Sequence, residues 1–303
     1  MSAAGEHRPS LLEGITIDPD YAGRKGYDAE FLGTESHSVP LPALPDELVP
    51  LAAVNSLGTT DPDYVLPYHH FSVVLNRERR LAFFTAVNID GSTSMRLKRE
   101  KDRWFLDPRV PAGEQTGEAA YTDNPLDRGH LVRRLDPAWG GSRDEVKLCN
   151  DDTFHFTNCS PQHEDFNRNR TTWAGLEDYI LENADNRDFK VTVFTGPVFA
   201  EDDEEFDGVQ LPRQFWKVAV MVGESGDLSA TGYLLSQEDL VSGLEVVPET
   251  FSYGAYRTYQ VTVRRIAELT GLSFGSLVDA DPLERLEGAV AASEIDRFDE
   301  IVL

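Results

Sequence analysis

Residues 121–134 read Tyr-Thr-Asp-Asn-Pro-Leu-Asp-Arg-Gly-His-Leu-Val-Arg-Arg, and Asp127–His130 within them combine three chemically useful features. The histidine can act as a base, the arginine can hold a phosphate, and the glycine keeps the backbone clear of side-chain bulk. A tetrapeptide of this kind recurs by chance, so its meaning depends on the residues that follow it.

Two further polar clusters follow the tetrapeptide along the chain. Residues 156–162 read Phe-Thr-Asn-Cys-Ser-Pro-Gln, and residues 165–178 read Asp-Phe-Asn-Arg-Asn-Arg-Thr-Thr-Trp-Ala-Gly-Leu-Glu-Asp. Amides near a reactive histidine serve as metal ligands or fix its tautomer. A carboxylate on a following helix can hold metal-bound water.

The order of these three clusters resembles that of the DNA/RNA non-specific endonuclease family, which includes the Serratia-type and NucA-type nucleases and endonuclease G. The resemblance covers roughly residues 70–275, and Phe194–Phe199 and Phe215–Lys217 match later landmarks of the family. Several motifs in one order are far more specific than any one of them.

The resemblance implies a ββα-metal site, in which one divalent ion is held by an asparagine and several waters. Position by position, His130 is the expected general base and Arg128 the expected phosphate contact. Asn158 matches the asparagine that supports the histidine, and Glu177 matches the helix glutamate that holds a metal-bound water. A histidine suits the role because its ordinary pKa of ~6.5 leaves it largely neutral at pH 7.

Two asparagines compete for the role of metal ligand. The family spacing counted forward from Gln162 reaches Asn167, whereas the spacing counted back from Trp173 reaches Asn169. Asn167 is slightly favoured because extra residues could be absorbed near the start of the helix. The other asparagine is then expected to cap that helix.

Arginines are the expected substrate contacts around this site. Arg103, in the basic run 96–104, is the expected second phosphate contact, with Arg99 behind it. Leu181 stands where some relatives carry a basic residue, so that contact is expected from other arginines. The full set of expected substrate-binding residues is Arg99, Arg133, Arg168 and Arg170.

Magnesium is the expected cofactor, because a site with few protein ligands and many waters suits its reluctance to dehydrate. Manganese would fit as well. Contacts to phosphate and sugar carry no sequence information, so we expect low sequence specificity and strong salt dependence. Asp127 is expected to brace the turn rather than to contact the metal.

The composition describes an acidic globular protein of 303 residues with a net charge of -25. This charge argues against a non-specific nucleic-acid coat protein but allows a local basic groove. The chain shows no secretory signal and no apolar run long enough for a membrane helix, and it has two cysteines, Cys149 and Cys159. We therefore expect a cytoplasmic protein without a membrane association, and we favour reduced thiols over a bridge.

We expect three regions: an N-terminal extension over 1–60 that packs on the main domain, an endonuclease domain over 61–278, and an acidic helical tail over 279–303. The expected fold class is α+β, with a mostly antiparallel central sheet flanked by helices. Apolar runs and turn residues support this expectation. They predict strands at 71–76, 81–89, 154–158, 190–195, 215–222 and 231–235, a helix at 171–182, a strand that runs into a helix over 261–271, and a helix over 282–295.

Two functional classes remain open at this level: a metal-dependent endonuclease for DNA, RNA or both, and a catalytically silent scaffold on the same fold. A nuclease of low specificity would endanger its own cell. An intracellular antiviral defence effector, kept off until triggered, is therefore our hypothesis, with the extension or the tail occluding the groove. A homodimer and a regulatory protease or sensor are the other expected partners.

Overall fold

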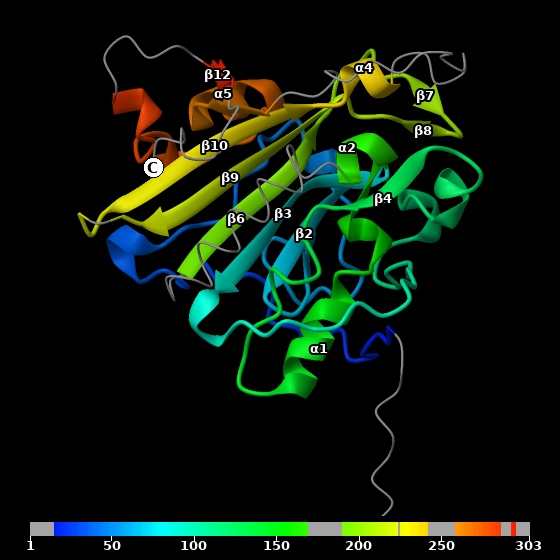
Figure 1. Ribbon diagram of the computed structural model, residues 1–303, viewed down its shortest axis with the longest axis horizontal. Helices are drawn as coiled ribbons and strands as arrows, with labels where there is room; N and C mark the ends of the chain where they lie inside the picture. The colour runs from blue at the N-terminus through cyan, green and yellow to red at the C-terminus, as the bar shows by residue number, and fades with distance from the viewer. Residues whose placement is uncertain (1–14, 169–189, 224, 242–257, 286–291, 295–303) are drawn as a thin grey trace, which may run out of the picture.

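An eight-stranded antiparallel sheet forms the centre of the protein in a computed structural model that describes residues 15–168, 190–223, 225–241, 258–285 and 292–294 (Figure 1). The sheet confirms the expected α+β class. In spatial order its strands are β1 (Val65–Pro67), β2 (Phe71–Asn76), β3 (Leu81–Asp90), β6 (Lys190–Val198), β9 (Gln214–Val222), β10 (Leu228–Ser236), β11 (Thr258–Val261) and β12 (Ala292–Glu294).

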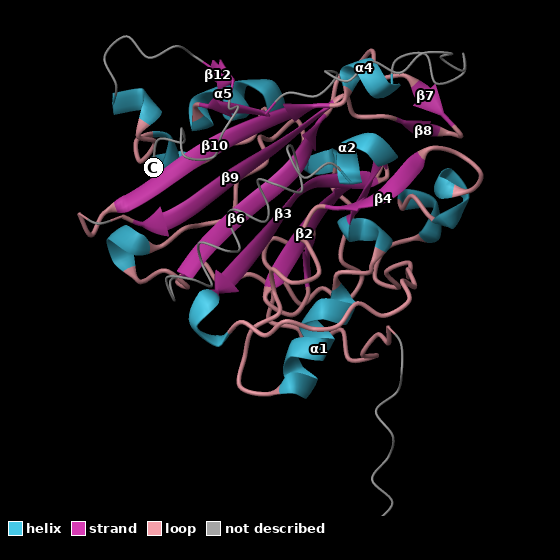
Figure 2. Cartoon of the chain, viewed as in Figure 1, coloured by secondary structure: helices cyan, strands magenta, loops and turns pink. Residues whose placement is uncertain are grey.

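Smaller elements surround this sheet (Figure 2). Two strand pairs stand apart from it: β4 (Leu126–His130) with β5 (Cys159–His163), and β7 (Glu205–Phe206) with β8 (Val209–Gln210). The α-helices are α1 (Arg143–Asp152), α2 (Glu164–Arg168), α4 (Glu238–Val241) and α5 (Val263–Thr270). Short 3-10 turns lie at Glu35–His37, Val49–Leu51, Gly91–Thr93, Ala112–Glu114, Glu118–Tyr121, Phe156–Asn158, Gly275–Val278 and Leu283–Arg285.

The central strands form where the sequence has apolar, β-branched runs. β2 and β3 make the expected hairpin around Arg77–Arg80, and β6, β9 and β10 confirm the other three long strands. Nearly every residue of β2, β3, β6 and β9 is buried, because both faces of the sheet are covered. α5 also confirms its prediction and ends at Gly271, whose φ of 72° is a left-handed conformation that glycine adopts readily.

One face of the sheet carries the β4–β5 pair and α2. Leu131 and Val132, which follow β4, and Phe166 of α2 are packed in one apolar cluster with side chains from β2, β3, β6 and β9. This packing fixes the strand pair and the helix against a rigid support.

The opposite face is covered by α5 and by the N-terminal segment that precedes β1. Val39 and Leu44 of that segment belong to the same apolar cluster as Trp216 of β9 and Ile266 of α5. Backbone bonds in both directions between Ala43 and Ser273 add to the attachment.

Three local predictions differ from the structure. The expected strand at 154–158 is instead one bridge at His155 followed by a 3-10 turn at Phe156–Asn158. The tail is not helical at Ala292–Glu294, which pairs with β11 as a strand. α1 was not expected at all. The helix expected over 171–182 lies outside the described residues, and no helix among those described could cross a membrane.

Candidate active site

The β4–β5 pair brings the three polar clusters of the sequence together. The strands are antiparallel, with His130 opposite Cys159 and Asp127 opposite Gln162. α2 begins at Glu164, directly after β5, and carries Asn167. Two strands and a helix therefore place residues that are 37 positions apart, His130 and Asn167, on one cleft.

Gly129 is required by the close approach of the neighbouring strand. A Cβ atom at this position would lie 2.2 Å from side-chain atoms of Gln162, which is fully buried. Any larger residue would force the buried Gln162 side chain to move. The glycine thus allows the tight pairing that holds His130 and Asp127 in place.

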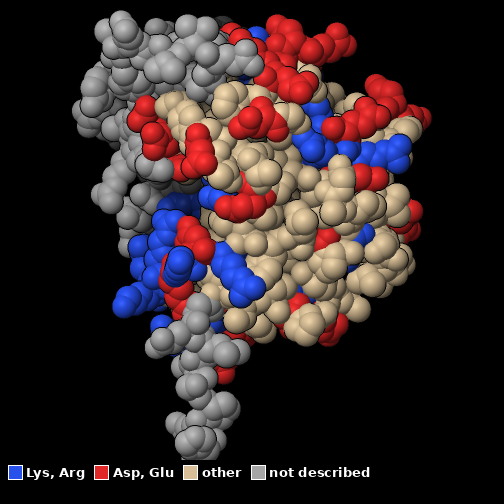
Figure 3. All heavy atoms as spheres, turned by 90° about the vertical axis from the view of Figure 1, so that its right-hand side faces the viewer, with Lys and Arg blue, Asp and Glu red and all other residues tan. Residues whose placement is uncertain are grey.

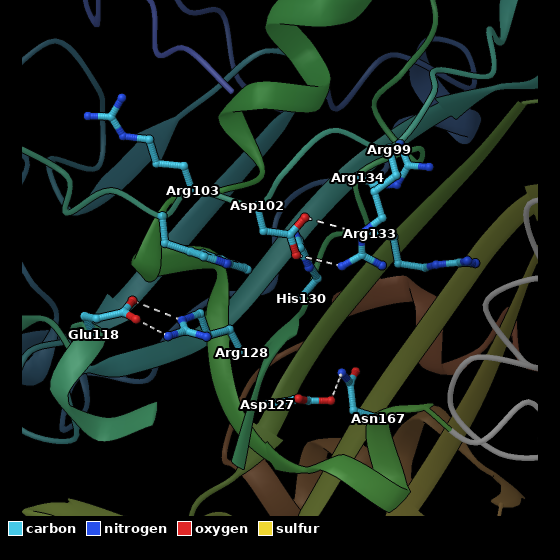
Figure 4. Close-up of a pocket in the computed structure, with 11 residues that line it drawn as sticks. Arg99, Asp102, Arg103, Glu118, Asp127, Arg128, His130, Arg133, Arg134 and Asn167 are labelled. Atoms are coloured by element: carbon cyan, nitrogen blue, oxygen red, sulfur yellow. Dashed lines mark hydrogen bonds and ion pairs between the residues drawn. The ribbon is translucent and has the colours of Figure 1, made fainter. Parts of the chain in front are cut away.

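A cleft of about 840 Å³ opens beside β4 and α2 (Figure 4). Its walls carry five arginines and three carboxylates, so the cleft is locally positive in a protein whose net charge is -25. The lining residues are Arg99, Asp102, Arg103, Trp104, Glu118, Asp127, Arg128, His130, Arg133, Arg134 and Asn167.

His130 is only partly exposed and lies among aromatic rings. Its ring centroid is 4.6 Å from that of Trp104 and 5.0 Å from that of Phe154. Burial lowers the pKa of His130 from about 6.5 to about 3. The nearby guanidinium groups add to this effect, and the carboxylate of Asp102 opposes it. The imidazole is therefore neutral at pH 7, which is the protonation state that a base requires.

Asp127 and Asn167 are bonded to each other at the cleft. The amide Nδ2 of Asn167 donates to the Asp127 carboxylate at 3.0 Å. Asp127 also lines the cleft. Because a carboxylate can only accept, this bond turns the amide oxygen of Asn167 away from Asp127.

Two of the arginines are paired with acidic side chains at the cleft. Arg128 donates to Glu118, with Nε at 3.1 Å, and its guanidinium lies over the Tyr121 ring. Arg99 donates to Asp102 at 2.6 Å. Asp102 is three residues from its arginine and Glu118 ten residues from its own, and both carboxylates occupy donors that a phosphate could also use.

Asn158 is fully buried and acts on the backbone next to His130. Its Oδ1 accepts from the Val132 N–H at 2.9 Å, and its Nδ2 donates to the carbonyls of Val132 and Thr153. Its own carbonyl accepts from the Leu131 N–H. The residue thus ties the 3-10 turn before β5 to the chain that leaves β4.

The structure brings together most of the described residues that the sequence singled out. Arg99, Arg103 and Arg133 line the same cleft as Arg128 and His130. The backbone of Arg168 ends α2, and Asn169, Arg170 and Glu177 lie outside the described residues. Sequence reasoning missed four lining residues, Asp102, Trp104, Glu118 and Arg134, because nothing in their local pattern links them to the cleft.

Basic side chains are also grouped on the surface of this acidic protein (Figure 3). The largest group of Lys and Arg side chains lies near the left border of the face shown, a second group lies at its upper right, and Asp and Glu occupy several other parts. A locally basic area in an acidic protein attracts a polyanion only over distances near the Debye length of about 8–10 Å.

The sheet, the strand pair with its helix, and the basic cleft are together those of a ββα nuclease. A model of the DNA/RNA non-specific endonuclease family matches residues 51–281, well over half of the chain. The protein belongs to this family, which confirms the resemblance seen in the sequence.

Individual relatives agree with this assignment. A protein of Sinorhizobium fredii called uncharacterized protein y4fB is 43% identical over 282 residues, which are 86% of this chain and 40% of that protein. The chain thus spans less than half the length of that relative. A nuclease of a Nostoc species is 27% identical over 76% of this chain and 80% of its own length. Nuclease C1 of Cunninghamella echinulata is 26% identical over 76% of this chain and 87% of its own.

A solved structure shows the same fold. A chain in the crystal structure of the EndoG/EndoGI complex matches with a TM-score of 0.53 at 20% identity, over 70% of this chain and 85% of that one. At this identity the likeness concerns the arrangement of the sheet and the ββα unit.

Proposed function

We propose that the protein is a divalent-metal-dependent endonuclease that hydrolyses phosphodiester bonds in DNA, RNA or both with little sequence preference. The observation that carries the proposal is the cleft in which neutral His130, the Asp127–Asn167 pair and five arginines meet. A silent scaffold would have no need to keep a base, an amide ligand and phosphate donors on one surface.

His130 is proposed as the general base. It takes a proton from a water molecule that attacks phosphorus on the side opposite the leaving oxygen. Its low pKa keeps the ring unprotonated, and its place in the cleft wall gives it access to substrate and water.

Asn167 is proposed as the protein ligand of the metal. Its amide oxygen is turned away from Asp127, and amide oxygen is a donor that hard cations accept. The described residues contain no group of three or more His, Cys, Asp or Glu side chains that could hold an ion. A site with one amide and many waters suits magnesium, or manganese, which when bound would neutralise charge on the phosphate and help the 3′-oxygen leave.

The arginines are proposed to hold the substrate. Arg128 and Arg103 contact phosphate oxygens next to the scissile bond, where a planar guanidinium can donate twice. Arg99 and Arg133 extend the contact along the strand, and contacts of this kind read no bases. Glu177 keeps the role that the family resemblance implies for it, and Arg168 and Arg170 are proposed to supply the phosphate contact that Leu181 cannot make.

Plasmid cleavage by purified His130→Ala and wild-type protein tests the function. We expect wild-type protein to nick supercoiled DNA in magnesium and to stop when EDTA is added, and we expect the variant to be inactive but folded. His37→Ala is the matched control, because His37 contacts only the Gly226 carbonyl among the contacts that are resolved and does not line the cleft. Equal cutting by wild type and His130→Ala would refute the assignment.

The cellular role is proposed as an intracellular defence effector that is held inactive until triggered, by a protease, a sensor or self-association. The reason is chemical: phosphate contacts cannot distinguish foreign from host nucleic acid. Controlled expression of wild type and His130→Ala in bacteria tests this role. We expect wild type to degrade host DNA or RNA only after a trigger, and unprovoked degradation would contradict the idea of a restrained enzyme.

A further inference from the structure

The strongest unassigned feature of the cleft is the aromatic surround of His130. Trp104 tilts at 49° to the imidazole, with ring centroids 4.6 Å apart, and Phe154 meets the imidazole edge-on at 87°. Trp104 and Phe154 also contact each other, at 5.3 Å between centroids. The three rings form one packed group.

The backbone holds this group from both sides. The Phe105 N–H donates to the Phe154 carbonyl at 3.0 Å, and the Phe156 N–H donates to the Phe105 carbonyl at 2.9 Å. The segment that carries Trp104 is therefore bonded to the segment that carries Phe154. The two aromatic side chains are therefore held next to each other, and the imidazole packs against both rings.

The surround also determines the solvation of the ring. His130 Nε2 is buried and has no hydrogen-bond partner among the described residues. Three guanidinium groups face the imidazole, those of Arg99, Arg133 and Arg134, and Asp102 is the facing carboxylate. Desolvation outweighs that carboxylate, and the pKa of His130 is lowered.

Trp104 differs from an ordinary core residue in its position. Its ring is only partly buried and lines the cleft beside His130, against whose imidazole it packs. The indole packs at the margin of an apolar cluster that includes Phe156. A residue needed only for packing would have no reason to form the cleft wall beside the base.

We propose that Trp104 is a positioning residue for the catalytic base: its indole fixes the orientation of the His130 imidazole and shields it from water. This inference rests on the proposed function, since it assigns a role within the same site. Trp104 would act on the rate and on its pH dependence, and the holding of substrate would remain with the arginines.

The test compares Trp104→Leu and Trp104→Phe with wild type in magnesium, with kcat and KM measured from pH 4 to 9. We expect Trp104→Leu to lower kcat at pH 7 by roughly 10–100-fold, because small displacements of a reacting group have effects of this size. Water reaching the ring raises the pKa of His130 from about 3 toward ~6.5, so the acid limb of kcat, which lies below pH 4 in wild type, moves up into the measured range. Trp104→Phe keeps an aromatic ring beside His130, so its kcat at pH 7 and its acid limb should stay close to those of wild type.

Trp139→Leu is the matched control. Trp139 also stacks on a histidine, His70, at 3.6 Å, but it does not line the cleft. We expect it to lower thermal stability without moving the acid limb. Its stability loss shows how much of the Trp104→Leu effect comes from loosening the fold.

Three results would overturn the inference: an unchanged kcat and acid limb in folded Trp104→Leu, a higher KM with unchanged kcat, or an equal shift of the acid limb in Trp139→Leu. The second result would make Trp104 a substrate contact. The His130→Ala variant separates the two proposals. If wild type cuts, His130→Ala does not, and Trp104→Leu matches wild type, then only the role of Trp104 fails.

Discussion

The carboxylate of Asp127 determines which atom of Asn167 can meet a cation. An amide side chain has one oxygen and one NH₂ group, and only the NH₂ group can donate to a carboxylate. The 3.0 Å bond from Asn167 Nδ2 to Asp127 therefore leaves the amide oxygen for the metal that we propose. Removal of a residue that hydrogen-bonds to a metal ligand commonly lowers metal affinity by roughly 10–100-fold.

Asp127→Ala should accordingly weaken the response to metal. We expect the magnesium concentration for half-maximal cleavage to rise by roughly tenfold or more, because Asn167 loses its fixed orientation. Cleavage measured at increasing magnesium or manganese concentration gives this half-maximal value. Asp123→Asn is the control, since Asp123 is exposed, does not line the cleft and has a φ of 57° that asparagine tolerates. An unchanged magnesium requirement in Asp127→Ala would show that the bond has no part in metal binding.

Glu118 occupies donors of Arg128 that substrate phosphate would use. Its side chain is 65% exposed, so the pair is screened and contributes only about 0.2–1 kcal/mol. Glu118→Gln should lower KM by up to about fivefold, with kcat unchanged, in steady-state assays at low salt. Glu114→Gln makes the same change in net charge outside the cleft. An equal decrease in KM for that control would assign the effect to overall charge.

At the scale of elements, the sequence specified the long strands best. β2, β3, β6 and β9 are runs of β-branched and aromatic residues buried on both faces, which is the strongest strand pattern. The β4–β5 pair came from the family resemblance, because Asp-Arg-Gly-His and Ser-Pro-Gln have no such pattern. α1 was missed since Val146 and Cys149 are its only buried apolar residues.

The two wrong elements have a common physical cause, which is competition from distant contacts. At 156–158 the alternation of Phe156 with polar residues resembles a strand, but Asn158 donates to and accepts from the chain at Val132 and bends the segment into a turn. At 292–294 pairing with β11 prevails over the helical preference of an alanine-rich segment.

Asn158→Ala tests the connection that Asn158 makes between the turn before β5 and the chain after β4. It leaves the N–H and the carbonyl of Val132 without their buried partner, so we expect a loss of about 1–3 kcal/mol in the free energy of unfolding. Urea denaturation followed by fluorescence measures it, and kcat should fall because the chain after His130 loosens. Full stability combined with lost activity would instead make Asn158 a direct participant in the chemistry.

At the scale of the whole molecule, a net charge of -25 surrounds a cleft with five arginines. Substrate phosphates are repelled by the body and attracted by the cleft, so binding should depend strongly on salt. We expect log kcat/KM to fall linearly with log salt concentration. Arg133→Gln should reduce the slope by about 0.9, the value for one phosphate contact on duplex DNA. Arg264→Gln, outside the cleft, should leave the slope unchanged, and equal slopes in all three proteins would remove Arg133 from the phosphate contacts.

The N-terminal segment is joined to the rest of the molecule by a buried ion pair. Arg24 donates to Asp152 at the end of α1, with side chains 0% and 1% exposed, and His69 also bonds this carboxylate. Burial alone would raise the pKa of Asp152, but the bonds from Arg24 and His69 lower it below its usual range. The pair therefore stabilises the fold above pH ~4, the unfolded pKa of aspartate, and this contribution is lost as pH falls through the folded pKa.

Arg24→Met should remove this contribution without harming the cleft. We expect the free energy of unfolding at pH 7 to fall by about 3–5 kcal/mol, because Asp152 stays buried without its arginine. The difference from wild type should shrink as pH falls through the folded pKa of Asp152 in the variant, which is higher than in wild type because burial is no longer offset by Arg24. Denaturant unfolding from pH 3 to 8 measures both effects. No described residue before Arg99 lines the cleft, so the folded variant should keep its kcat. A rise in activity on loosening this segment would instead support occlusion of the groove by the extension.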